Sequence, residues 1–386
     1  MPTLSKKKSI RNEEPMNIAI RVDASLEMGT GHVMRCLTLA ELLRNKGASL
    51  YFICRLLKGN LVEIIQAKGF KVYTLPKPSQ HQIVKKLNNH SHWLGVDWRV
   101  DADETLEAIQ KSKKKMDILI SDHYALQKEW EQYLRPIVKK IMVIDDLADR
   151  PHDCDYLLDQ NYYQNMFIRY KNLIPPQCKV FLGPKYALLR KEFLQEAKQL
   201  RKRDGSIKRI LIFFGGSDYH NMTEKALRAL LKLKKKDIVI DIVVGQNYLY
   251  HQKLKELCFK FKFINYHRQV NNIAQLMNMA DLCIGAGGIT TWERCYMGLP
   301  TILISVAKNQ ELIAQNLSQA KAVMYLGSYL NVTQEKILKT VLYLIKNPQE
   351  VKELSKRSKE IIGNERNGLD MLSDILLNER EIAKKE

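Results

Sequence analysis

The sequence has no long apolar run, no closely spaced pair of cysteines and no metal-binding pattern. No window approaches the ~20 uncharged apolar residues of a membrane-spanning helix. Residues 1–15 are polar and basic and lack the apolar stretch of a signal peptide. The seven cysteines include no C-x-x-C pair, so we expect reduced thiols and a cytoplasmic protein. His123 and the pair His90 and His92 lack further ligands at suitable spacing, so we expect no metal ion.

The loops of several familiar enzyme classes are also missing. The sequence contains no Gly-x-Ser-x-Gly elbow of serine hydrolases and no Walker A loop of nucleoside triphosphatases. Gly29 and Gly31 follow an apolar run, but Met34 stands where a dinucleotide-binding loop would carry its third glycine. These absences argue against an esterase of that type, a P-loop enzyme and an NAD enzyme, and we expect no cofactor.

The chain carries a large excess of positive charge. Lysine and arginine number 62 against 42 acidic residues, which gives a formal net charge of +20. Such a surface attracts nucleic acid, anionic lipid or phosphorylated small molecules. We interpret lysine-rich segments such as residues 111–115 and 232–236 as solvated faces of a monomer. Weak association with a membrane surface stays open, whereas the lack of interleaved aromatic and basic repeats argues against nucleic acid.

Strand-like and helix-like segments alternate along most of the chain. This pattern predicts an α/β fold with two Rossmann-type, doubly wound domains facing a cleft. Residues 16–24 resemble a buried strand, which precedes a glycine-containing loop and an amphipathic helix, and the same plan restarts at residue 208. We predict a long charged helix at 190–203. The predicted divisions are a disordered leader at 1–15, an N-terminal domain at 16–165, an interdomain connection at 166–205, a C-terminal domain at 206–365 and a helical tail at 366–386.

The first chemical motif lies in the loop after the first predicted strand. Gly29 and Gly31 allow close approach of the backbone to a ligand, and the following helix presents its positive end to anions. His32 stands in the first turn of this helix, beside Arg35. The helix dipole and a nearby cation both favour neutral imidazole, which can accept a proton from water. Alternatively, His32 only caps the helix or bonds the loop.

Two glycine-containing loops follow strands in the second half of the chain. Their backbone N–H groups and nearby hydroxyls could hold a diphosphate at residues 215–218 and 285–291. Glu293 lies one turn further on, and its carboxylate could accept two hydrogen bonds from the paired hydroxyls of a ribose. The alternatives are ordinary strand-to-helix turns and a glutamate that only complements the helix dipole.

Further polar residues end other predicted strands. Residues 121–124 and 145–146 fall on the edge of the sheet where parallel strands present ligand-binding groups. Asn309 and Gln310 follow the last strong strand and offer neutral hydrogen bonds to a sugar.

Several of these motifs together resemble a known family. Residues 21–36, 121–124, 143–150 and 153–161 resemble the UDP-sugar hydrolases of bacterial pseudaminic acid biosynthesis, whose substrate is UDP-2,4-diacetamido-2,4,6-trideoxy-β-L-altropyranose. The similarity extends over nearly the whole chain after Met16. Residues 285–300 also resemble the donor site of the glycosyltransferase that completes lipid II, which implies a GT-B architecture.

The resemblance implies a mechanism without metal or cofactor. His32 would act as general base on a water that attacks the anomeric carbon with inversion, and UDP would leave. The C-terminal domain would bind UDP, with Glu293 on the ribose. Tyr124 and Asn309 match family positions near the sugar. The predicted substrate-binding residues are Asp23, Gly29, Gly31, Arg35, Tyr124, Ser217, Gly288, Thr290, Thr291, Glu293, Asn309 and Gln310.

Two other functions compete with hydrolysis. A GT-B glycosyltransferase would use the same base and UDP site to pass an amino-sugar to an acceptor alcohol. A non-enzymatic basic protein would instead bind nucleic acid, with steep salt dependence and no affinity for UDP.

Overall fold

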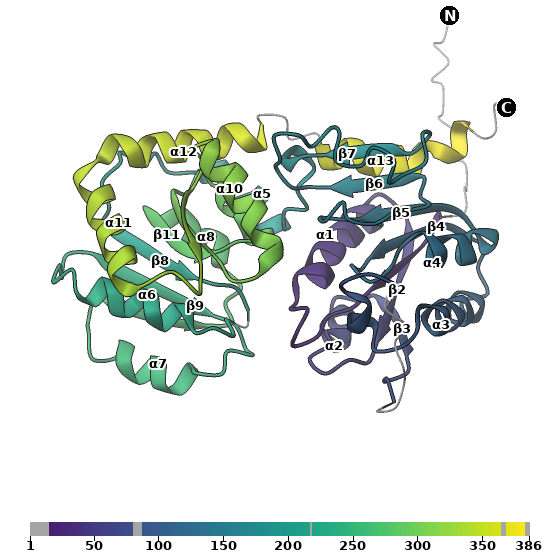
Figure 1. The fold of residues 1–386 in the computed structure, drawn as a ribbon, viewed down its shortest axis with the longest axis horizontal. Coiled ribbons are helices and arrows are strands. Elements are labelled where there is room, and N and C mark those ends of the chain that lie inside the picture. The colour runs from purple at the N-terminus through teal and green to yellow at the C-terminus, as the bar shows by residue number, and fades with distance from the viewer. Residues whose placement is uncertain (1–14, 80–86, 217, 364–367, 383–386) are drawn as a thin grey trace, which may run out of the picture.

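The computed structural model describes residues 15–79, 87–216, 218–363 and 368–382. Within them the chain forms two α/β domains, each built on an all-parallel sheet (Figure 1). The predicted pair of Rossmann-type domains is therefore confirmed. The predicted leader at 1–15 lies outside the described residues except for Pro15. Among the described helices, none is long and apolar enough to cross a membrane.

The N-terminal sheet has seven strands in the order β3-β2-β1-β4-β5-β6-β7. The strands are β1 (Asn17–Val22), β2 (Ser49–Arg55), β3 (Lys71–Leu75), β4 (Met116–Asp122), β5 (Val138–Ile144), β6 (Tyr156–Asp159) and β7 (Lys179–Leu182). Strand residues alternate between two apolar cores because successive side chains point to opposite faces. Ile18 and Ile20 pack with helices α1 (Gly31–Asn45) and α2 (Val62–Ala67), whereas Ala19 packs with α3 (Trp98–Lys111) and α4 (Lys128–Leu134).

The C-terminal sheet has six strands in the order β10-β9-β8-β11-β12-β13. The strands are β8 (Arg209–Phe213), β9 (Val239–Val244), β10 (Ile264–Arg268), β11 (Leu282–Ala286), β12 (Thr301–Ser305) and β13 (Met324–Ser328). One face packs against α6 (Met222–Leu231), α7 (His251–Cys258), α11 (Gln334–Lys346) and α12 (Pro348–Ile362). The other face packs against α8 (Ile273–Met279), α9 (Ile289–Tyr296) and α10 (Glu311–Gln319).

The link between the domains differs from the sequence prediction. Strand β7 pairs with β6, so the N-terminal sheet extends into the region predicted as connection. The apolar pattern of β7 in the sequence is weak because only two of its residues, Phe181 and Leu182, are buried. The predicted helix at 190–203 is also wrong as one element, since α5 covers only Lys191–Glu196 and a short 3₁₀ turn follows.

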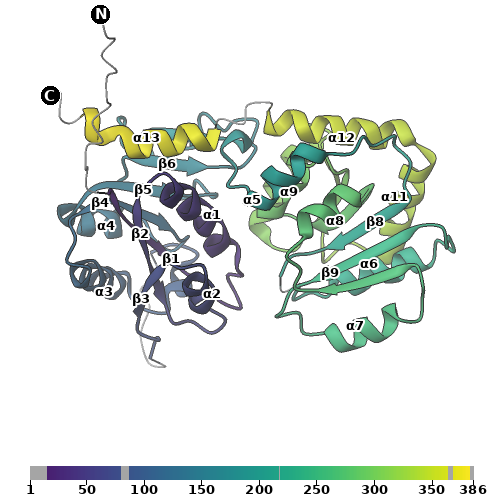
Figure 2. The same cartoon turned by 180° about the vertical axis from the view of Figure 1, so that it is seen from behind.

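The last helix returns to the first domain. Helix α13 (Gly368–Ile382) lies along the N-terminal domain beside α1 (Figure 2). Leu372 and Leu376 are fully buried in the same apolar core as Leu39 and Leu43 of α1. The chain therefore crosses between the domains twice, and the predicted helical tail belongs to the N-terminal core.

Candidate active site

The two domains touch at the beginning of α1. A Cβ atom added at Gly31 would lie 3.2 Å from Cδ1 of Ile289, the first residue of α9. A Cβ atom added at Gly216, after β8, would lie 3.7 Å from Oγ1 of Thr30. Within the described residues, no side chain caps the first turn of α1 or α9. The N-terminal ends of two helices thus meet beside a glycine loop, an arrangement that favours an anionic ligand.

His32 is held at this meeting point by an acidic partner. Nδ1 of its ring lies 2.6 Å from Oδ1 of Asp122, the last residue of β4. An ionised carboxylate at this distance keeps the proton on Nδ1, so we assign the tautomer whose Nε2 accepts a proton. Sequence reasoning placed Asp122 on the correct edge of the sheet but missed its pairing with His32. The pairing could not be predicted because the sequence does not show that β1 and β4 are neighbours in the sheet.

Arg35 supports the same carboxylate. Its Nε and Nη2 donate to Asp122 at 2.6 and 2.7 Å, and its Nη1 donates to Asp146 at 2.7 and 2.9 Å. The side chain is buried against these two carboxylates, and the substrate contact of Arg35 stays a prediction. Burial alone would raise the pKa of Asp122, but the charge of Arg35 and the hydrogen bonds from Arg35 and His32 outweigh it and lower that pKa.

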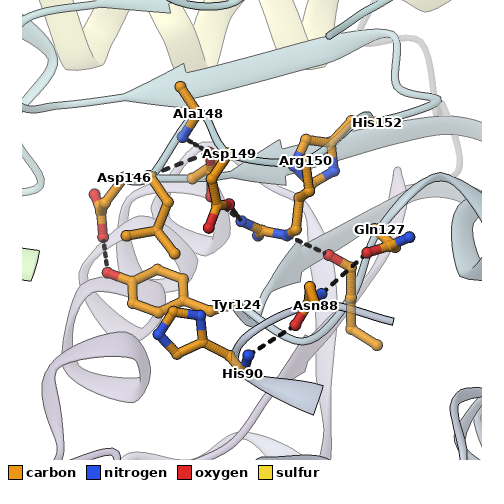
Figure 3. A network of polar contacts seen from close by, with 12 residues as sticks. Asn88, His90, Tyr124, Gln127, Asp146, Ala148, Asp149, Arg150 and His152 are labelled. Atoms are coloured by element: carbon orange, nitrogen blue, oxygen red, sulfur yellow. Dashed lines mark hydrogen bonds and ion pairs between the residues drawn. The ribbon is translucent and has the colours of Figure 1, made fainter. Parts of the chain in front are cut away.

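Tyr124 forms the next part of the site. Its ring meets the His32 ring edge-on at a centroid distance of 4.6 Å. Its hydroxyl donates to Oδ2 of Asp146 at 2.5 Å, a contact visible in Figure 3. Burial and the charge of Asp146 raise the pKa of Tyr124 well above its ordinary value, which keeps the phenol protonated. Tyr124 therefore lies beside His32 with its hydroxyl already engaged, and its contact with the sugar stays a prediction.

Asp23 lies deeper than predicted. It has no exposed surface, and both carboxylate oxygens accept hydrogen bonds from Arg21. Its Oδ1 also accepts the backbone N–H of Arg55 at 2.7 Å. Asp23 thus supplies the buried partner that the charge of Arg21 requires, and its substrate contact stays a prediction.

Glu293 is paired with a residue that the sequence did not assign. Nε and Nη2 of Arg190, just before α5, donate to its two carboxylate oxygens at 2.6 and 2.9 Å. Glu293 is only 1% exposed. A ribose would therefore have to displace Arg190 or share the carboxylate with it, so direct access to a free Glu293 is not present in this conformation.

Most of the remaining predicted residues lie in the loop before α9, in the first turn of α9 or on the turn after β12. Gly288 has φ +105°, a backbone conformation that other residues rarely adopt, and it precedes the first turn of α9. Thr290 and Thr291 accept hydrogen bonds from Arg294, and Thr291 is buried. Gln310 reaches the glycine loop, since its Oε1 lies 3.2 Å from a Cβ atom added at Gly287.

Of two further predicted residues, one is exposed and the other lies outside the described residues. Asn309 is exposed on the turn after β12. Ser217 lies outside the described residues. Over the part of the chain that the structure describes, no group of three or more His, Cys, Asp and Glu residues is placed to hold a metal ion.

Known proteins resemble both the C-terminal half and the whole chain. A model of the glycosyltransferase family 28 C-terminal domain matches residues 210–367. The chain is 28% identical over 305 residues to the UDP-2,4-diacetamido-2,4,6-trideoxy-β-L-altropyranose hydrolase of Campylobacter jejuni, covering 79% of this chain and 97% of that protein. It is 29% identical over 297 residues to an uncharacterized protein of Methanocaldococcus jannaschii, covering 75% of this chain but only 55% of that protein.

The fold has solved counterparts as well. The crystal structure of MurG from Acinetobacter baumannii matches with a TM-score of 0.63 at 15% identity, covering 94% of this chain and 99% of that one. At such low identity the match shows the fold alone, and it supports the predicted GT-B architecture. The chain thus has the GT-B fold, is similar over most of its length to the UDP-2,4-diacetamido-2,4,6-trideoxy-β-L-altropyranose hydrolase of Campylobacter jejuni, and matches the glycosyltransferase family 28 C-terminal domain over residues 210–367.

Proposed function

We propose that this protein hydrolyses a UDP-linked amino-sugar at the anomeric carbon and releases free sugar and UDP. One observation carries the proposal. The His32–Asp122 pair lies in the first turn of α1, next to Gly31, where that helix meets Ile289 of the opposite domain. A base held in this way, beside the N-terminal ends of two helices, suits the activation of water against a bound nucleotide sugar.

The proposed reaction breaks the bond between C1 of the sugar and the oxygen of the β-phosphate. The water oxygen attacks C1 while its proton moves to Nε2 of His32. Asp122 then stabilises the imidazolium that forms. The leaving UDP takes the bonding electrons, and the N–H groups at the ends of α1 and α9 stabilise its added charge.

The proposed substrate is UDP-2,4-diacetamido-2,4,6-trideoxy-β-L-altropyranose. The name of the Campylobacter relative supports this choice, since that protein covers most of the chain. We place the diphosphate at Gly216, Gly288 and Thr290, and the ribose at Glu293 after Arg190 has moved. Asn309 and Gln310, on the turn after β12, are proposed sugar contacts.

A glycosyltransferase is the second candidate function. The match of residues 210–367 to a glycosyltransferase domain favours it. His32 would then take its proton from the hydroxyl of an acceptor in place of water, and the geometry of the pair with Asp122 serves either nucleophile.

One incubation separates the two functions. Purified protein is mixed with the UDP-sugar in ¹⁸O-labelled water, without any acceptor alcohol. Hydrolysis at C1 gives equal amounts of UDP and free sugar, with the label in the sugar and an inverted anomer by NMR. Label in UDP would refute attack at C1. Release of UDP only after addition of an acceptor would establish the glycosyltransferase instead.

A further inference from the structure

Two aromatic residues without an assigned role, Trp93 and His90, lie beside Tyr124, and Trp93 also lies near the candidate base. Trp93 stacks on Tyr124 with ring centroids 5.5 Å apart and planes 25° apart. His90 meets both rings edge-on, at 4.8 Å from Trp93 and 5.4 Å from Tyr124. The Trp93 ring is 6.4 Å from the His32 ring. We call Trp93, Tyr124 and His90 the aromatic wall.

Hydrogen bonds fasten this wall to the end of β4. The Asn88 side chain donates to the carbonyl of Ala125 at 3.3 Å and to Oε1 of Gln127 at 3.0 Å. Oδ1 of Asn88 accepts the backbone N–H of His90 at 2.9 Å. Figure 3 shows His90 beside Tyr124, with dashed lines that join Asn88 to His90 and to Gln127. The loop that carries Trp93 is therefore anchored to the strand that carries Asp122 and Tyr124.

The wall is also joined to the loop that leads into His32. Oε1 of Glu27, between β1 and α1, accepts the indole N–H of Trp93 at 3.2 Å. The same oxygen lies 2.9 Å from Nε2 of His92. The indole is thus fixed without any bound molecule, which lowers the entropy cost of ordering it around a ligand.

The hydrogen-bond donors of Trp93 and Tyr124 in the aromatic wall are already occupied. The single donor of Trp93 is taken by Glu27, and the hydroxyl hydrogen of Tyr124 is taken by Asp146. Trp93 is half-buried whereas Tyr124 is buried, so of these two side chains it is Trp93 that offers its ring carbon atoms to a neighbouring molecule. A sugar hydroxyl packed against the Trp93 ring would lose water without gaining a donor or acceptor, whereas a methyl group would gain apolar contact.

We propose that the aromatic wall, centred on Trp93, selects sugars that carry N-acyl or deoxy methyl groups. The proposal rests on the proposed function, because attack at C1 places the sugar ring within one water molecule of His32. Sugars bearing hydroxyls in place of these methyl groups fit the wall poorly, so Trp93 is a specificity-determining residue for the sugar half of the substrate.

Kinetics of Trp93→Ala and Trp93→Phe test the proposal, with Trp98→Ala as the matched control. Trp98 is a half-buried tryptophan five positions along, at the start of α3. We expect Trp93→Ala to raise KM for the diacetamido-trideoxy UDP-sugar about tenfold and to reduce its preference over UDP-glucose similarly. The KM and the sugar preference of Trp93→Phe should lie between those of Trp93→Ala and wild type. The dissociation constant of Trp93→Ala for UDP should stay within about twofold of the wild-type value. The KM, kcat and UDP dissociation constant of Trp98→Ala should also stay within about twofold of wild type.

Unchanged KM and unchanged sugar preference in folded Trp93→Ala would overturn the proposal. Thermal melting of each variant establishes folding, and Trp93→Phe supplies the answer should the alanine variant not fold. If the wild-type protein releases UDP from no UDP-sugar, the proposed function fails separately. The wall is then tested by the Trp93 indole ¹H–¹⁵N signal, identified by its loss in Trp93→Phe. That signal should shift with the UDP-sugar but not with UDP, and equal shifts would refute the wall.

Discussion

Oδ1 of Asp122 lies 2.6 Å from Nδ1 of His32, although the two residues are 90 positions apart in the chain. The contact exists because β1 and β4 are neighbours in the sheet, so the end of β4 meets the helix that follows β1. It gives the imidazole one engaged nitrogen and one nitrogen, Nε2, with no hydrogen-bond partner among the described residues. The direction of proton transfer is thereby set before any substrate arrives.

Asp122→Asn should reduce kcat for UDP release by about 10- to 100-fold while UDP still binds. The amide can donate to Nδ1 and favour the tautomer with its proton on Nε2, which cannot act as the base. UDP titration by calorimetry and a steady-state assay measure the two effects. A variant with wild-type kcat would show that Asp122 does not set the tautomer.

His32→Ala should lower kcat at least about 10²-fold, since it removes the proposed base altogether. The UDP dissociation constant should change little, because the variant keeps the backbone N–H groups of α1 and the other proposed nucleotide contacts lie on the C-terminal domain. His251→Ala, on α7 of that domain, is a control that should retain activity. Turnover at the wild-type rate by His32→Ala would remove His32 from the mechanism.

Glu293→Ala should weaken UDP binding by about 10- to 100-fold, the effect of losing hydrogen bonds to a charged group. The sharper readout compares UDP with 2′-deoxy-UDP. Wild type and Arg190→Ala should prefer UDP, because both retain the Glu293 carboxylate, and Glu293→Ala should lose the preference. Equal discrimination in all three proteins would disprove the ribose contact.

Much of the fold could be predicted because buried parallel strands have a plain signature. All seven residues of β4 are buried, and its apolar run stands out in the sequence. Gly288 was recognised at a turn, and its φ of +105° confirms the need for glycine there. Strand β7 was missed because an edge strand with two exposed residues has no such pattern.

The partners of the site residues could not be predicted in the same way. Glu293 and Arg190 are 103 residues apart, and their pairing depends on how the connection passes α9. Asp23 was a reasonable candidate, since it follows a strand at the ligand-binding edge. Its burial with Arg21 became visible only once packing was known. Trp93 has no motif at all, and its place beside His32 comes from a loop anchored by Asn88.

Acid should destabilise the protein through its buried carboxylates. The pKa values of Asp23 and Asp122 lie below the ordinary 3.8, because their ion pairs outweigh the opposing effect of burial. The unfolded chain therefore binds more protons than the native state as pH falls below about 5, and unfolding is favoured. Melting temperatures should be steady above about pH 5 and fall steadily below pH 4.

The variant Asp122→Asn should show a shallower decline of melting temperature with acid than wild type. Asp237→Asn alters an exposed carboxyl before β9 and should leave the slope unchanged. Parallel wild-type and Asp122→Asn curves would mean that the Asp122 ion pairs do not contribute to the acid response.

Gly245→Ala should damage the nucleotide side of the site through the backbone alone. A Cβ atom at Gly245, after β9, would lie 2.1 Å from the carbonyl oxygen of Gly216, so the loop after β8 must move. We expect a loss of about 1–3 kcal/mol in stability and weaker UDP binding. Gly31→Ala meets only the end of the Ile289 side chain at 3.2 Å, so its melting temperature should fall less. If Gly245→Ala melts at a lower temperature yet binds UDP normally, the loop at Gly216 does not hold the diphosphate.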